Sequence, residues 1–185
     1  MIGNAIAGFL GAGVAASTTA YESIATTTVG GGGASPITFS SIPSTYTHLQ
    51  LRILSRLSTT TTGGRITFNS DTATNYSRHY LEGTGSSAVA GGSASVAYID
   101  CINATISSDA ASIFGVNVID ILDYANTNKY KTIKNLAGVD TNSAGYVDLY
   151  SGNWRSTSAI TTITITPQAG SYVQYSSFAL YGIKG

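Results

Sequence analysis

Charged side chains are scarce in this sequence. Of its 185 residues only 10% are Asp, Glu, Lys or Arg, whereas about 25% is usual for soluble domains. Nine basic and nine acidic residues cancel, so the formal net charge is +0. The chain therefore lacks the basic surface with which a protein binds nucleic acid or an anionic membrane. We expect the protein to bind no nucleic acid and to contain no membrane span.

Cysteine and histidine, which often build metal and redox sites, are almost absent. Cys101 is the single cysteine, which excludes an intrachain disulfide and a cysteine-based zinc site, and we expect it to be a small core residue. The two histidines are His48 and His79. Asp120 and Asp123, at the end of a predicted strand, could line a loop for a hard cation. A polar strand end explains the same residues, and we expect no metal or cofactor.

The chain carries no pattern that identifies an enzyme. It has no G-x-S-x-G nucleophile elbow, and only two histidines could serve a Ser–His–Asp triad, which forms in space rather than in sequence. Its acidic residues have no placement distinctive of glycoside hydrolysis. Twelve Tyr are spread along the chain, and tyrosine suits both sandwich cores and protein interfaces. A net charge near zero also favours association. We therefore expect a non-enzymatic protein that acts through protein contacts; the enzyme alternative is a carbohydrate-active or esterase-like sandwich.

Hydrophobic periodicity predicts an all-β protein. The clearest alternation covers residues 48–57 and predicts a half-buried antiparallel strand. Its core-facing side chains would be Leu49, Leu51, Ile53 and Leu57. Arg52 and Arg56 would lie on a solvated or partner-facing surface.

Other stretches extend this pattern to about nine or ten short strands. The candidate stretches lie at residues 21–29, 37–42, 66–68, 75–82, 95–102, 113–122, 129–137, 145–150, 154–158, 159–166 and 172–183. The run 113–122 is apolar on both faces, so we expect it to be covered on both sides. Residues 83–94, rich in Gly, Ser and Ala, are expected to form a long loop, and Ser108–Ser112 is a weak helical candidate. The pattern indicates an antiparallel β-sandwich, jelly-roll-like, over residues 21–185.

Residues 1–20 contain no charged side chain. A signal peptide would need a basic n-region, and a membrane span would need about 20 mainly apolar residues. This run is shorter and is interrupted by Asn4. We expect an apolar N-terminal arm that packs on a partner; a membrane-active segment and a plain tail are the alternatives. The partner-binding side chains of the arm would be Ile2, Ile6, Phe9, Leu10 and Val14.

Three stretches of sequence resemble a recurrent kind of small structural protein of tailed bacteriophages. They are ITFSSIPSTYTHLQLRILSR (residues 37–56), RITFNSDTATNYSRHYLEGTGSSA (65–88) and SSFALYGIKG (176–185). In that group a segment like ITFSSIP-TYTHLQL is followed by FN-D---NYS-HYL, and the chain ends in a phrase like LYGIKG. The resemblance covers roughly residues 21–185 and leaves out the arm.

This resemblance implies a jelly-roll-like sandwich, commonly in homotrimers, located in the virion. One possible position is the capsid surface, where a decoration (cement) protein would bind the major capsid protein or another virion protein and clamp the shell. The alternative is a tail or head fibre protein that binds a host receptor or glycan. The short chain, the absence of a fibrous repeat and the apolar arm favour the capsid surface.

Overall fold

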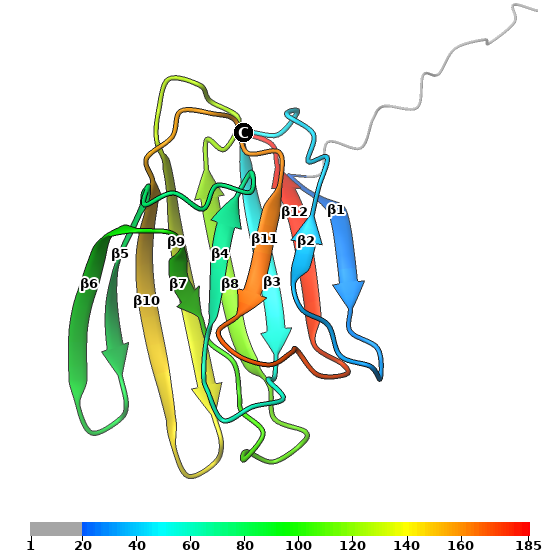
Figure 1. The fold of residues 1–185 in the computed structure, drawn as a ribbon, viewed down its shortest axis with the longest axis vertical. Coiled ribbons are helices and arrows are strands. Elements are labelled where there is room, and N and C mark those ends of the chain that lie inside the picture. The colour runs from blue at the N-terminus through cyan, green and yellow to red at the C-terminus, as the bar shows by residue number, and fades with distance from the viewer. Residues whose placement is uncertain (1–19) are drawn as a thin grey trace, which may run out of the picture.

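The computed structural model describes residues 20–185, which form two antiparallel β-sheets packed face to face (Figure 1). This confirms the predicted all-β sandwich; the jelly-roll topology stays a prediction. The described part of the chain contains no helix. The helical candidate at Ser108–Ser112 is therefore wrong. The Asp109 carboxylate there accepts a hydrogen bond from the backbone N–H of Ile106 at 2.8 Å and stabilises a turn instead.

The large sheet has eight strands. In spatial order they are β1 (Tyr21–Thr28), β12 (Ser177–Ile183), β3 (His48–Ser55), β8 (Gly115–Leu122), β9 (Lys131–Asp140), β10 (Gly145–Trp154), β5 (Tyr76–Gly83) and β6 (Ala88–Val96). The small sheet has four strands. They are β2 (Ile37–Phe39), β11 (Ile163–Pro167), β4 (Gly64–Phe68) and β7 (Ile99–Ile102).

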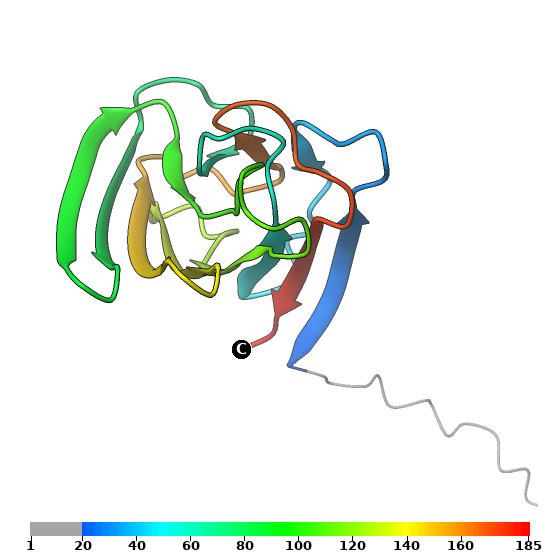
Figure 2. The ribbon, with the colours of Figure 1, turned by 90° about the horizontal axis from the view of Figure 1, so that it is seen from below.

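From β1 to β12 the chain passes back and forth between the two sheets, because one or more strands of the large sheet separate each strand of the small sheet from the next. The strands β1, β3, β8 and β12 form one half of the large sheet, called here the first half, and β2, β4, β7 and β11 form the small sheet. The hairpins β5–β6 and β9–β10 extend the large sheet beyond β8 and make its second half. Figure 2 shows the second half curving upward at its β5–β6 end.

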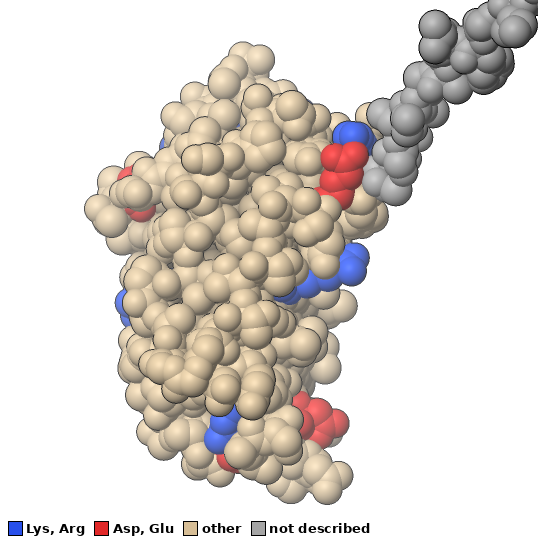
Figure 3. Space-filling model, turned by 90° about the vertical axis from the view of Figure 1, so that its right-hand side faces the viewer, with Lys and Arg blue, Asp and Glu red and all other residues tan. Residues whose placement is uncertain are grey.

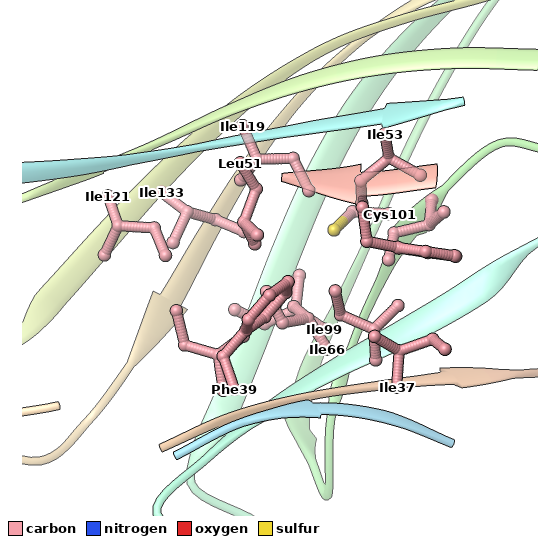
Figure 4. Close-up of a cluster of buried hydrophobic side chains, with 14 of the residues drawn as sticks. Ile37, Phe39, Leu51, Ile53, Ile66, Ile99, Cys101, Ile119, Ile121 and Ile133 are labelled. Carbon is pink, nitrogen blue, oxygen red and sulfur yellow. The ribbon is translucent and has the colours of Figure 1, made fainter. Parts of the chain in front are cut away.

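The core lies between the two sheets, where inward side chains of both meet (Figure 4). Leu49, Leu51, Ile53 and Leu57 are all buried there, which confirms the predicted face of the strand 48–57. Cys101 on β7 is buried in the same core, also as predicted, and burial raises the pKa of its thiol. Each fully buried aliphatic side chain contributes about 1.5–3 kcal/mol.

Several strand predictions differ from the structure. Residues 83–94 are not a long loop: a tight turn at 84–87 leads into β6, and β5 pairs with β6 along its whole length. Strand β12 begins at Ser177 rather than at residue 172. Strand β11 begins at Ile163, four residues into the predicted stretch 159–166, and the predicted stretch 154–158 is not a separate strand because Trp154 ends β10. The low β-propensity of Gly, Ser and Ala hid β6, since neighbouring strands rather than propensity decide pairing.

Arg56 was predicted to lie on a solvated or partner-facing surface, and this is wrong because its side chain is buried. Its Nη2 donates to the backbone oxygens of Ser107 and Asp109 at 3.2 and 2.8 Å. Strand β3 ends at Ser55, so the alternation no longer sets the direction of the next side chain. Arg56 instead bridges to Thr105 and holds the loop after β7 against the sandwich. Arg52 is exposed, as predicted.

Candidate interaction surface

The outer face of the large sheet carries a group of exposed apolar side chains, called here the leucine patch. Its members are Leu54, Leu81, Val116, Leu136, Val147 and Leu149. They come from the neighbouring strands β3, β8, β9, β10 and β5. In each strand they alternate with buried or partly buried side chains that face inward, so the same pleat produces both surfaces.

Three leucines form the centre of the patch. Leu136 on β9 is directly opposite Leu149 on β10, and Leu149 is directly opposite Leu81 on β5. Directly opposed side chains in antiparallel strands have Cβ atoms about 4.5–5.5 Å apart, so the three form one continuous row across three strands. Their exposed fractions are 53%, 48% and 54%. A second row follows the register Leu54, Val116, Gly138 and Val147.

A band of polar side chains, called here the polar band, borders the leucine patch on the same face. Arg52 Nε donates to Gln50 Oε1 at 2.8 Å, and Gln50 Nε2 donates to Asp120 Oδ1 at 2.8 Å. Asp120 also forms an ion pair with Lys134, whose Nζ lies 3.1 Å from Oδ2. The Arg52 guanidinium lies 4.9 Å from the centre of the Tyr181 ring. These contacts hold the polar side chains in fixed positions across four strands, from β12 to β9.

The combination of an apolar centre and a polar border is that of a protein interface. Scattered surface leucines are ordinary, but contiguous exposed apolar patches on soluble proteins mark contact sites or aggregation liabilities. The rest of the described surface carries few charges; Figure 3 shows them scattered on the side of the molecule that includes β1. We therefore take the outer face of the large sheet as the candidate interaction surface.

The leucine patch continues to an open sheet edge. Leu81 is directly opposite Ala90 on β6, the outermost strand of the second half. The nine residues of β6 include no charged residue and no proline. Proteins usually protect an open edge with charges, proline or a bulge against pairing with another chain; here only a register shift near Tyr76 interrupts it. The edge therefore belongs to the same candidate surface.

The chain matched no protein-family model, no curated protein and no solved structure. The interaction surface is thus argued from its own geometry. Among residues 20–185 there is no helix with the length and apolarity needed to cross a membrane. The partner-binding residues predicted for the arm, Ile2, Ile6, Phe9, Leu10 and Val14, lie outside the described residues.

The structure assigns lysine partners to the acidic residues considered for a cation. Asp120 pairs with Lys134 in the polar band, and Asp123 Oδ2 lies 2.5 Å from Lys129 Nζ. The hydrogen bond and charge of Lys129 lower the pKa of the Asp123 carboxyl. His48 Nδ1 accepts a hydrogen bond from the backbone N–H of Asp123 at 3.0 Å. These contacts favour the polar strand end over a cation loop.

A second polar feature lies inside the sandwich and is called here the buried polar cluster. Its members are Asn103, Asn117, Asn135, Asp148 and Tyr150. Asn117 Oδ1 accepts from the backbone N–H of Asn103 at 2.9 Å and from Asn135 Nδ2 at 3.1 Å, and Asn117 Nδ2 donates to the backbone oxygen of Asn103 at 2.7 Å. Burial, and next the hydrogen bond to Asp148, raise the pKa of the Tyr150 hydroxyl.

Sequence reasoning predicted the strands of both features but not the features themselves. The signals were present in the alternation. Leu136 and Leu149 occupy the outward positions of β9 and β10, where polar residues are usual. Asn135 and Asp148 occupy inward positions between apolar neighbours, where polar residues are rare. Trp154 is buried in the core, stacked on Tyr76 with ring centres 6.3 Å apart.

Proposed function

We propose that this chain is a non-enzymatic structural protein of a bacteriophage virion, a capsid decoration protein that docks through the leucine patch. In this role it binds the surface of the shell and stabilises it through protein contacts. The observation that carries the proposal is the contiguous exposed row Leu136, Leu149 and Leu81 beside a preformed polar band. Such a face can bury its apolar side chains against a partner, away from water, with little rearrangement of the backbone.

The positions of the three resembling segments support the virion assignment. Residues 37–56 include β2 and β3, residues 65–88 include most of β4 and all of β5, and residues 176–185 include β12. Strands β3 and β12 are neighbours at the centre of the first half. The segments therefore describe a scaffold, as expected for a structural family. The repeated passage of the chain between two sheets supports the jelly-roll interpretation.

A sedimentation experiment tests the docking face. Purified chain is mixed with particles that lack it, and the bound fraction is measured after pelleting. The double variant Leu136→Lys and Leu149→Lys places two charges in the centre of the patch, and we expect binding at least tenfold weaker, since an unpaired charge in an interface costs more than 1.4 kcal/mol. The control Thr38→Lys adds a charge to the exposed outer face of the small sheet.

Undiminished binding of the double variant would show that the leucine patch is not the docking face. Circular dichroism and thermal unfolding of each variant confirm that the fold is retained. Light scattering of the unbound chain measures the number of copies in the free oligomer, for which the resemblance implies three.

A second experiment tests the arm: deletion of residues 1–20 should reduce occupancy on the particle or the resistance of the particle to heat. Unchanged occupancy and heat resistance would contradict the role of Ile2, Ile6, Phe9, Leu10 and Val14.

A further inference from the structure

A polar cavity of about 260 Å³ lies on the inner side of the second half, between β5 and β10 of the large sheet and the end of β7. Its polar lining includes Arg78, Glu82, Asp100, Asp148 and Tyr150. These side chains come from the inward positions of β5 and β10 and from β7. Small-molecule sites combine a cavity with a few fixed polar groups in this way.

Asp148 is the most unusual residue of this cavity. Only 1% of it is exposed, and its Oδ2 accepts hydrogen bonds from Asn103 Nδ2 and, at 2.9 Å, from the Tyr150 hydroxyl. Its Oδ1 is buried as well and has no donor among the described residues. A buried carboxylate oxygen is stable when a donor reaches it. Asp148 Oδ1 is therefore available to accept a hydrogen bond from a molecule in the cavity.

The basic residue of the cavity does not supply that donor. Arg78 is engaged with Asp100: its Nη1 donates to the Asp100 backbone oxygen at 2.8 Å, and its Nη2 lies 3.5 Å from Oδ2. Gln168 Nε2 also donates to Asp100, at 2.6 Å. Glu82 is directly opposite Asp148 in the β5–β10 register, and like charges in opposed positions repel. Two carboxylates thus share the cavity without a cationic partner among residues 20–185.

Tyr146 connects this cavity to two further hollows of about 490 and 510 Å³ at the same end of the sandwich. Both hollows are lined by short side chains of the β5–β6 and β9–β10 turns, such as Thr84, Ser143 and Ala144, and by no Lys or Arg. Burial raises the pKa of Tyr146 to about 12, so its hydroxyl is protonated at neutral pH and can donate. The end of the sandwich offers acceptors and hydroxyls, and little that would hold an anion.

We propose that this cavity binds one sugar unit of a neutral saccharide, with the adjoining hollows accommodating further units. A sugar hydroxyl can donate to Asp148 Oδ1 and accept from the Tyr146 hydroxyl at once. Glu82 supplies a second acceptor, and the tyrosine rings supply apolar faces for the C–H side of the sugar. A site with buried acceptors also rejects molecules that lack the matching hydroxyls.

A divalent cation fits the cavity less well. Calcium takes six to eight oxygen ligands, and the described residues bring no three His, Cys, Asp or Glu side chains together for a metal. The saccharide site goes beyond the docking role proposed above and does not depend on it, because the cavity and the leucine patch lie on opposite faces of the large sheet.

Nuclear magnetic resonance of the ¹⁵N-labelled full chain tests the proposal. Glucose, galactose, mannose, rhamnose, N-acetylglucosamine and N-acetylgalactosamine are each added at millimolar concentration. We expect at least one of them to shift the backbone amide signals of Glu82, Tyr146 and Asp148, and to leave those of Leu54 and Val116, at the distant end of the leucine patch, unchanged. Absence of shifts with all six sugars, or shifts confined to another surface, would overturn the proposal.

Matched variants then assign the contact. Asp148→Asn should weaken binding of the active sugar about tenfold, the effect of one charge-assisted hydrogen bond. Glu82→Gln, on the less buried wall of the cavity, should weaken it as well and gives a second test if Asp148→Asn does not fold. Asp120→Asn, in the polar band, should bind as the wild type does. Full affinity in both cavity variants, or calcium chloride alone shifting Glu82 and Asp148, would overturn the saccharide site.

Discussion

The two halves of the large sheet turn different side chains toward the same interior. In the first half the buried inward side chains are apolar, except for Asn117 on β8 and Ser55 on β3. They include Leu49, Leu51, Ile53, Ile119, Ile121, Phe178 and Leu180. In the second half, polar and charged side chains take many of the corresponding positions. They are Lys131, Asn135 and Asp148, with Arg78 and Glu82 on the adjoining strand.

The polar groups of the second half are held by specific partners. Lys131 is buried, and its Nζ donates to the backbone oxygens of Lys129 and Thr157 at 2.8 and 3.2 Å as well as to that of Asn126. Burial lowers the pKa of this lysine. A satisfied buried network specifies one arrangement of its members, whereas apolar contacts mainly add stability. The first half therefore mainly stabilises the fold, and the second half carries the buried charged side chains of the large sheet, Lys131 and Asp148.

The largest expected effect is in the first half. Leu51→Ala removes a fully buried side chain between Leu180 and Ile119, its partners on the two neighbouring strands. We expect the free energy of unfolding to fall by about 4 kcal/mol, as measured by urea denaturation. Leu54→Ala, on the outer face of the same strand, should cost less than about 1 kcal/mol. Equal losses in the two variants would contradict the division between core and outer face.

Asn117→Ala tests the buried polar cluster, and we expect a smaller loss of about 2–3 kcal/mol. The substitution removes the partner of the Asn103 backbone N–H, one of the two donors to the Asn103 backbone oxygen, and one of the two acceptors of Asn135 Nδ2. Urea denaturation again gives the measurement. Asn128→Ala, in an exposed turn, is the matched control. A loss no greater than that of the control would mean that the cluster contributes nothing to stability.

Alkaline pH should act on the second half through Tyr76. Burial, and next the charge of Asp71, raise the pKa of Tyr76 to about 12. The pKa of a tyrosine is near 10 in the unfolded chain and about 12 for Tyr76 in the folded protein. The stability contributed by the protonated Tyr76 is therefore fully present below pH 10 and is lost as the pH rises from about 10 to about 12. We expect a loss on the order of 2 kcal/mol between pH 9 and 12. In Tyr76→Phe this part of the pH dependence should disappear; an identical slope in both proteins would count against it.

The smallest effects are expected on the outer faces of both halves. Val116→Thr in the first half and Leu149→Thr in the second half should each change the free energy of unfolding by less than about 0.5 kcal/mol in dilute solution. Both side chains are about half exposed, so folding of one chain gains little from them. Thermal unfolding of dilute samples provides the measurement. Losses above 1 kcal/mol would show that a partner already covers this face in solution.

Much of the fold could be predicted from residues 48–57, because alternation over a strand with one covered face reports its burial directly. The run 113–122 shows the limit of this reasoning. It is apolar on both faces and was expected to be covered on both sides, yet Val116 and Leu122 are about half exposed. The sequence of a strand that is apolar on both faces is the same whether its outer face is covered by another part of the chain, covered by a partner or exposed to solvent.

The candidate features were harder to predict for the same reason. The polar members of the cavity, from Arg78 to Asp148, are far apart in the sequence and meet only when β5 pairs with β10. Strand β6 was missed because its Gly, Ser and Ala residues have little preference for strands, and its pairing with β5 decides its conformation. Strand pairing between distant segments is not visible in local composition.

Because Cys101 is buried, the rate at which its thiol reacts with a dye measures how often the sandwich opens. Cys101 is 1% exposed, and burial raises its pKa, so little reactive thiolate is available while the two sheets remain packed. A thiol-reactive dye can therefore modify the chain only when β7 separates from the large sheet. At high dye concentration the rate of labelling equals the rate of that opening. One natural residue thus reports the lifetime of the closed sandwich without any introduced label.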